Sequence, residues 1–308
     1  MIECRPFNNS DPPAIASFWH RHPLQGLARP MTPSVLDQVV LGKLHFRADQ
    51  LLLAVDGEHL LGLAHLVPPA PPSETPVPLT LNMLLVDPDG DHPQEVADKL
   101  LQAGLENYQG EVFTARAFSP NLFYTGLYGG TCFPGLLESD SVVIEALSRS
   151  GFQVTHRRGI FRAMASRLSL PIDQATRQLR RTSQATIRPV LQEADWRQAN
   201  VRSHLQRTLI QLESSRDGVL LGQIETWDPN PLANDWSGPA IGVHQLHTNG
   251  GDNSEVVSRA LVAEAISFIR RTPSEFIEIH DDLLTTSELE GFGFELVDQG
   301  LEMERRRG

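Results

Sequence analysis

The sequence is short of cysteine, of basic residues and of long apolar runs, and each shortage excludes a class of protein. Two cysteines, Cys4 and Cys132, stand in 308 residues. They are too few for a disulfide framework, and their spacing fits no metal site. Acidic residues outnumber basic ones by 38 to 26, which gives a net charge of −12. A protein that binds nucleic acid or an anionic membrane needs a basic face, so neither partner is expected.

Apolar residues do not gather into any run of the length that a membrane span needs. The first residues, MIECRPFNNSDPP, place acidic and polar side chains where a signal peptide has its apolar core. A cytoplasmic globular protein is therefore expected. Its length suits one large domain or two of ordinary size.

Two parts of the chain repeat each other at a constant offset. LLGLAHL (60–66) resembles LLGQIET (220–226), and LNMLLVDPDGD (81–91) matches IGVHQLHTNGGD (241–252). A helical run follows in each half, and each half closes on a Gly-Phe pair and an alternating segment. This shared order indicates a duplication.

The border between the halves is expected where periodicity breaks, around Pro171 and its polar neighbours. The sequence therefore predicts one domain at residues 1–168 and a second at 169–308. Alternating segments indicate strands at 51–55 and 60–67 around a turn, which is typical of a mixed α/β domain.

A helix is predicted at residues 255–271, directly after the second repeated segment. Val257, Leu261 and Ala265 recur at a spacing of four, which predicts one buried helix face. Ser254 is the expected N-cap residue.

The order of strand pair, central strand, turn, helix, strand and terminal Gly-Phe strand resembles the GNAT superfamily of N-acetyltransferases. The resemblance covers nearly the whole chain and is carried by three segments, DGEHLLGLAHL, AIGVHQLHTNGGDNSEVVSRALVAEAISFI and GFGFELVDQGLEMER. It implies two tandem GNAT-like acyl-CoA N-acyltransferase domains of mixed α/β fold, each with a splayed central strand. It also implies acetyl-CoA at the N-terminus of the following helix, where unpaired backbone N–H groups suit a pyrophosphate.

The acetyl-CoA loop of that superfamily has the form Arg/Gln-x-x-Gly-x-Gly/Ala, whose small residues let a phosphate approach the backbone. In the second half these slots hold Asn253, Val256 and Ser258, so the middle glycine is missing. The first half has Glu95 in the middle slot, and a carboxylate there repels a pyrophosphate. The resemblance therefore places acetyl-CoA in the second half. The expected contacts are Leu246, His247, Asn253, Val256, Val257, Ser258, Arg259 and Asp282.

A general base is expected on the strands before the helix, where Glu225 and His244 are the candidates. Each has a structural alternative, a solvated strand residue for Glu225 and a partly buried, hydrogen-bonded histidine for His244. His244 and His247 are three residues apart on a strand and point to opposite faces, so no shared metal is expected. The superfamily's tyrosine, which protonates the leaving thiolate, is matched by Leu289, and leucine cannot donate a proton.

Three hypotheses about function remain open at this point. The leading hypothesis is transfer of an acetyl group from acetyl-CoA to an amine of a small molecule. The alternative is a catalytically inactive GNAT-like protein that binds a ligand or partner through its cleft, which the missing glycines and tyrosine favour. A homodimeric scaffold joined through the Gly-Phe strands is a third hypothesis.

The Gly-rich segment GLYGGTCFPG (126–135) is expected to form a loop.

Overall fold

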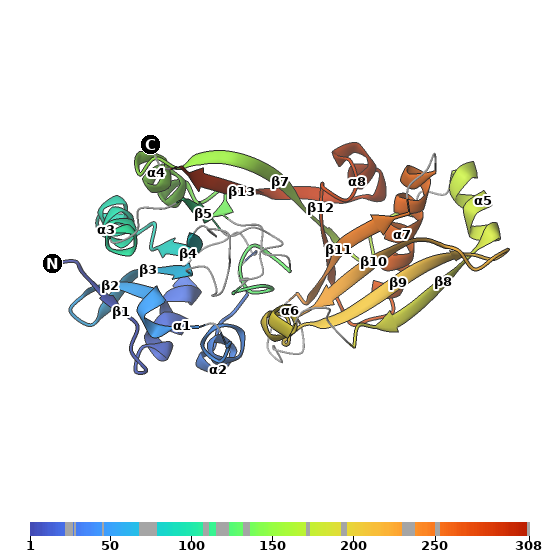
Figure 1. Cartoon of the computed structure of the whole chain (residues 1–308). Coiled ribbons are helices and arrows are strands. Elements are labelled where there is room, and N and C mark those ends of the chain that lie inside the picture. The colour runs from blue at the N-terminus through green and yellow to red at the C-terminus, as the bar shows by residue number, and fades with distance from the viewer. Residues whose placement is uncertain are drawn as a thin grey trace. The chain divides into compact units, whose positions relative to one another are not determined.

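The computed structural model of the protein describes residues 1–21, 27, 29–44, 46–67, 79–106, 111–114, 123–131, 136–170, 173–191, 196–229, 238–249 and 253–306. Backbone contacts divide the chain into two compact units, and each unit is described by itself (Figure 1). The first unit comprises Met1–Arg157 together with Gln299–Gly308, and the second comprises Arg158–Asp298. The chain thus passes between the units after Arg157 and again after Asp298, and the single domain border at residues 168 and 169 stays a prediction from the sequence.

The sheet of the first unit is mostly antiparallel. Its order is β1 (Glu3–Pro6), β2 (Leu51–Asp56), β3 (His59–Val67), β4 (Leu79–Val86), β5 (Val112–Thr114) and then the end of β13 (Glu295–Arg305). Strands β4 and β5 are the parallel pair. Strand β6 (Leu136–Leu137) also pairs with β13, through Gly300 and Leu301. The C-terminal strand is thus part of the first sheet.

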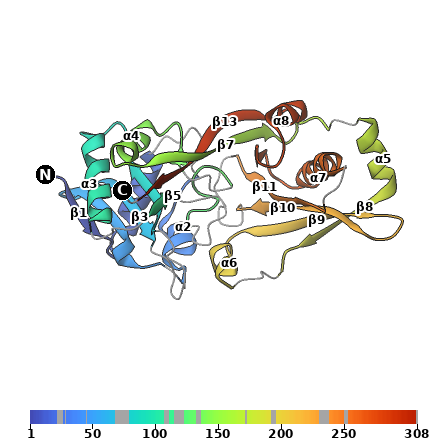
Figure 2. The ribbon, with the colours of Figure 1, turned by 45° about the horizontal axis from the view of Figure 1, so that its top comes forward.

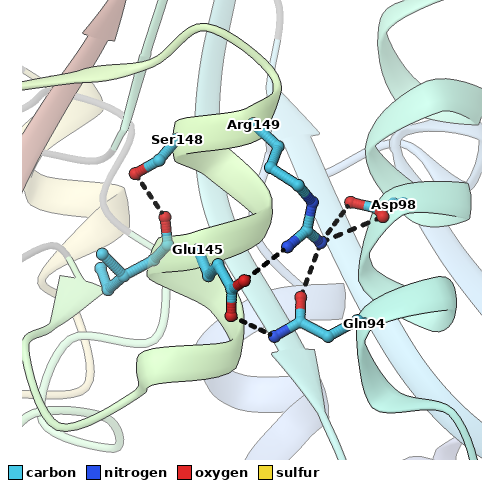
Figure 3. A network of polar contacts seen from close by, with 6 residues as sticks. Gln94, Asp98, Glu145, Ser148 and Arg149 are labelled. Carbon is cyan, nitrogen blue, oxygen red and sulfur yellow. Dashed lines mark hydrogen bonds and ion pairs between the residues drawn. The ribbon is translucent and has the colours of Figure 1, made fainter.

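Helices α3 (Pro93–Leu105) and α4 (Ser141–Arg149) cover one face of that sheet. Their apolar sides bury a common core with the strands, formed by Ala64, Leu66, Leu81, Leu84, Val96, Leu100, Val143, Leu147 and Leu301 among others. Figure 3 shows a polar network that joins the two helices at the surface. Arg149 contacts Asp98 at 2.9 Å and Glu145 at 3.1 Å. Gln94 donates to Glu145 at 2.9 Å.

The N-terminal part of the first unit is helical between β1 and β2. It comprises α1 (Pro12–Arg21), α2 (Pro33–Leu36), a π-helical turn (Asp37–Leu41) and a 3-10 turn (Ala48–Gln50). From this part, the Phe46 ring lies 5.8 Å from the ring of His65, on the face of β3 opposite to Ala64 and Leu66.

The second unit repeats the arrangement with its own strands. Its order is the end of β7 (Gln153–Met164), β12 (Phe276–His280), β11 (Ala240–Thr248), β10 (Leu220–Asp228), β9 (Gln206–Ser214) and β8 (Ser183–Pro189). Strands β11 and β12 are its parallel pair. Helices α5 (Gln174–Thr182), α6 (Trp196–Val201), α7 (Ser254–Ile269) and α8 (Thr286–Phe292) complete the unit. In Figure 2, α7 lies above β9 and β10 and α6 lies below them.

The predicted helix at 255–271 is confirmed as α7, and its buried side chains include Val257, Leu261 and Ala265. The prediction of Ser254 as N-cap is wrong by one residue. Asn253 is the N-cap residue, and its side chain makes no capping hydrogen bond. The glycines at 250 and 251 lie outside the described residues.

Candidate active site

The sheet of the second unit has one apolar and one polar face, because side chains alternate along each strand. Ile224, Val243 and Ile279 belong to the core beneath α7. Their neighbours Glu225 and His244 face the other side, which we call the polar face of the second sheet. Glu225 on β10 pairs directly with His244 on β11, so the structure brings the two predicted base candidates together.

The parallel strands β11 and β12 separate next to His244. Within the described residues, β11 pairs with β12 only over Ala240–Gly242 and Phe276–Glu278. His244 and His280 stand two residues beyond the last pair, and their ring centroids are 6.2 Å apart. The sheet therefore opens between these two histidines, as expected for a splayed central strand.

A β-bulge lies beside the opening. Gln223 pairs with His247, whereas Glu225 pairs with His244, so β11 carries one residue more than β10 over this interval. Gln245, within the bulge, has a left-handed backbone with φ 49°. A bulge interrupts the ladder and re-aims backbone groups. The backbone at Gln245 is therefore displaced from regular pairing where β11 leaves β12.

Glu225 is held in place by several donors. Its Oε2 accepts from Arg207 Nε at 3.1 Å and Nη2 at 2.7 Å, and from Trp227 Nε1 at 3.1 Å. Gln245, with its amide oriented by its hydrogen bonds, donates to Glu225 Oε1 at 3.1 Å. The side chains of Arg207 and Glu225 are only 7% and 12% exposed. Glu225 is therefore an anchored carboxylate and not the solvated residue of the alternative interpretation.

His244 is buried against an aromatic ring. It is 3% exposed, and its ring centroid lies 4.4 Å from that of Trp227. Burial holds the pKa of His244 well below its usual range, and the positive charges of His280 and Arg202 lower the pKa further. The imidazole is consequently neutral at pH 7 and has the protonation state that a proton acceptor needs.

The N-terminus of α7 presents unpaired backbone donors. The first intrahelical bond runs from Val257 N to Asn253 O at 3.0 Å. The N–H groups of the residues before it, Ser254 to Val256, therefore precede the helical ladder, and Asn253 does not cap them with its side chain. Val256 is half-buried. These donors and the helix dipole favour an anion at this end.

The other predicted acetyl-CoA contacts have different surroundings. The Val257 side chain belongs to the core, and Leu246 packs against the same core. Ser258 Oγ donates to Ser254 O at 2.9 Å. His247 is exposed near the end of β11. Because the Val257 side chain is in the core, only the backbone of Val257 is available to contact a cofactor.

Arg259 and Asp282 already have charged partners. Arg259 contacts Asp173 at 3.3 Å, Glu288 at 3.7 Å and Glu255 at 3.8 Å. It therefore links α7 to both α5 and α8, and carboxylates surround its positive charge. Asp282 lies 3.6 Å from Arg158. Ion pairing thus accounts for both side chains within the described fold.

The first unit has a different set of residues at the matching place. His65 takes the position of Glu225, and Asn82 lies where the register between β3 and β4 shifts. Burial lowers the pKa of His65 to about 3, and its Nδ1 lies 3.1 Å from the hydroxyl of Tyr124. Tyr124 lies in segment 123–131, which leads into the Gly-rich residues and is buried throughout. This segment therefore packs over His65, while Cys132 and the rest of 132–135 lie outside the described residues.

Sequence reasoning missed four residues of the second site, namely Arg207, Trp227, Gln245 and His280. Arg207 and Gln245 depend on register, since only the pairing shows that Arg207 lies beside Glu225 and that Gln245 is bulged. Trp227 shares a face with Glu225 through the alternation of side chains along β10. The signal for His280 was available, because it is a polar residue that ends the apolar strand FIEIH.

Some classes of site are absent from the described residues. They include no cluster of three or more side chains that could hold a metal ion. None of the helices within the described ranges has the length and apolar character to cross a membrane.

No protein-family model matches the sequence, and no curated protein matches it. Among solved structures, the chain is similar to a tandem GNAT protein from the clavulanic acid biosynthesis pathway. The two are 10% identical with a TM-score of 0.63, over 100% of this chain and 99% of that one. It is also similar to a GCN5-related N-acetyltransferase from Sphaerobacter thermophilus, at 10% identity and a TM-score of 0.58, over 99% and 95% of the two chains.

A third structure is a GCN5-related glucosamine N-acetyltransferase region of a fungal multi-domain GH3 β-N-acetylglucosaminidase. It is 12% identical with a TM-score of 0.66, over 99% of this chain and 38% of that one. At these identities the likeness concerns the fold. The chain has the tandem GNAT fold, and the prediction of that mixed α/β fold is confirmed.

Proposed function

We propose that the chain is an acyl-CoA-dependent N-acetyltransferase that acts on an amine of a small molecule, with its working site in the second unit. The observation that carries the proposal is the opening between β11 and β12 beside the bulge at Gln245. The uncapped start of α7 follows within the same βα connection. The tandem GNAT fold supports acyl transfer as the class of reaction.

The residues at α7 fit an acyl-CoA. The N–H groups from Ser254 to Val256 are suited to the pyrophosphate, with Asn253 and Ser258 beside them. Leu246 and His247 line the path along β11. We assign no pyrophosphate contact to Arg259, because carboxylates already surround it. When bound, acetyl-CoA supplies an activated acyl group as a thioester.

Side chains and backbone groups of the chain itself deprotonate the acceptor amine and stabilise the charge that develops during transfer. His244 is neutral and takes the ammonium proton of the acceptor amine, which leaves the amine with a free lone pair. The ring of Trp227 contacts that of His244 at a tilt of 46°, and Glu225 fixes the indole of Trp227 by accepting a hydrogen bond of 3.1 Å from its Nε1. Backbone N–H groups displaced at the Gln245 bulge are donors for negative charge that develops on an acyl oxygen.

The test is amine-dependent release of the CoA thiol by the full chain. The panel contains amino sugars, amino alcohols, amino acids and aryl amines. Amino sugars are included because one structural neighbour is described as a glucosamine N-acetyltransferase region. The variants are His244→Gln and, as a control, His156→Gln, which alters an exposed histidine outside the proposed acetyl-CoA and amine sites.

We expect thiol release with at least one class of amine. The loss of a general base lowers kcat by roughly 100-fold or more in His244→Gln, and the control stays near wild type. Acetyl-CoA binding without release for any amine would contradict the proposal and favour a catalytically inactive binding module.

A further inference from the structure

The polar face of the second sheet holds a second buried histidine that the proposed reaction does not yet use. His244 on β11 and His280 on β12 are 3% and 4% exposed, and their rings meet edge to face where the strands part. We call these two residues the histidine pair.

Charged neighbours of His244 and His280 differ in sign. His244 faces Glu225 across the strand, but that carboxylate is neutralised by Arg207. The positive charge of Arg202, which follows α6 and lies over the Trp227 ring at 4.9 Å, disfavours a proton on His244. A proton at His244 therefore has little electrostatic support.

His280 lies among carboxylates. Burial lowers the pKa of His280, whereas Asp282, Glu278 and Asp281 raise it, and Arg158 on β7 partly opposes them. Asp281 accepts from Gly159 N at 2.9 Å. The acidic surroundings stabilise a positive charge on His280 more than on His244, so a proton shared by the pair resides on His280.

We propose that His280 receives and holds the proton that His244 removes from the acceptor amine, so that the histidine pair works as a relay. This inference rests on the proposed function. The N–H bond of the ammonium breaks and a bond forms to one ring nitrogen of His244. The proton on the other ring nitrogen of His244 then moves to His280, through a bridging water, and leaves toward Asp282 and solvent. No electron transfer is involved, and the charge of the pair returns to zero when the proton leaves.

The histidine pair takes up only one proton beyond its two neutral rings, because two positive rings at this separation repel each other. Such groups titrate in two steps that belong to the pair. Without His280, a proton on His244 loses the acceptor that the relay supplies, and its release from His244 is slowed. His280 is thus a proton-relay residue that acts through His244 and does not touch the substrate.

The experiment compares the full-length wild type with His280→Gln and with His156→Gln, at an exposed position of β7, as the matched control. The first readout is the titration of the ring nitrogens by heteronuclear NMR, which requires no substrate. The second readout is the pH profile of kcat/KM for acetyl transfer. Calorimetric binding of acetyl-CoA checks that the variants retain the cofactor site.

We expect His280 to protonate at higher pH than His244, and His244 to protonate at higher pH in His280→Gln than in the wild type, because one repulsive charge is gone. We also expect kcat in His280→Gln to fall by about tenfold or more, since acid–base groups contribute on that scale. The acidic limb of the pH profile of kcat/KM should shift along the pH axis in the same variant. His156→Gln should change neither readout, and acetyl-CoA affinity should stay the same in both variants.

Independent titration of the two rings would overturn the pairing. A wild-type pH profile in His280→Gln would overturn the relay even if the rings are coupled. Failure of the proposed function is a separate outcome, seen as no transfer by the wild type. Coupled rings without any transfer would keep the pair as a buried proton site and overturn its role in catalysis.

Discussion

Gly62 and Gly222 occupy equivalent positions in the two units. A Cβ atom on Gly62 would lie 2.9 Å from Val96 Cγ1, and one on Gly222 would lie 3.0 Å from Val257 Cγ1. Helices α3 and α7 therefore approach their sheets in the same way, through the first turn of each helix and the second strand of each hairpin. The duplication read from the sequence is thus visible in side-chain packing.

Alanine at either glycine should destabilise its own unit. The added methyl would also lie 2.8 Å from Leu85 O or 2.7 Å from His247 O, which are backbone atoms that cannot rotate away. We expect the free energy of unfolding to fall by about 1–3 kcal/mol for Gly62→Ala and for Gly222→Ala. Gly291→Ala in α8 is the control, because a Cβ there meets nothing within 4 Å. Urea denaturation measures the free energy of unfolding of all three variants. A Gly222→Ala variant as stable as the wild type would contradict the close packing at this glycine.

Substitution of one partner in the buried ion pair of Arg207 and Glu225 should lower the free energy of unfolding far more than substitution in a surface network. Arg207→Met removes both guanidinium donors and leaves a carboxylate with 12% exposure. Breaking such a pair typically costs about 3–5 kcal/mol. The double variant Arg207→Met with Glu225→Gln should recover much of the loss, because no uncompensated charge remains. Denaturation curves for the single and double variants test this, and equal losses would refute it.

Arg149→Met is the matched control for that experiment. Arg149 also contacts two carboxylates (Figure 3), but its side chain is 40% exposed and those of Asp98 and Glu145 are 48% and 64% exposed. Exposed pairs contribute about 0–1 kcal/mol because water and salt screen them. We expect Arg149→Met to change the free energy of unfolding by no more than this amount.

Stability should fall as the pH falls below the ordinary pKa of histidine. The pKa of His65 drops from 6.5 to about 3 on folding because the ring is buried. Between these values the unfolded chain binds a proton that the folded chain excludes, so acid favours unfolding by up to about 1.4 kcal/mol per pH unit. His65→Phe should flatten this dependence between pH 6.5 and pH 3, whereas His156→Gln, at an exposed position, should not. Unfolding free energies at several pH values decide the matter.

Removal of the last strand should unfold the first unit. Leu301 and Met303 are 1% and 2% exposed, and both belong to the core of α3 and α4. A chain that ends at Asp298 loses these side chains and the partner strand of β5 and β6. We expect loss of cooperative unfolding and rapid proteolysis within residues 1–157. A chain that ends at Arg305 keeps the strand and should resist the protease.

Local patterns predict the elements of this fold well. The spacing of Val257, Leu261 and Ala265 gave α7, and the repeated Leu-Leu-Gly gave the hairpin strand that meets each helix. These features depend on neighbours within a few turns of the chain. The return of β13 to the first unit depends on pairing between residues far apart, such as Leu136 and Leu301, and no local pattern contains it.

The candidate site shows the same limit. The sequence singled out Glu225 and His244, and the register places them opposite each other. It could not show that the guanidinium of Arg207 binds the carboxylate of Glu225, because this depends on the register between β9 and β10. The acetyl-CoA contacts remain predictions.

Calorimetric titration with acetyl-CoA tests the central claim most directly. The account predicts one molecule bound per chain, loss of binding in Val256→Glu at the start of α7, and unchanged binding in Glu95→Gln at the equivalent turn of α3. A second site of similar affinity, or binding that Val256→Glu leaves intact, would contradict the assignment of acetyl-CoA to the second unit. No heat from a folded wild-type protein would contradict the acetyltransferase itself.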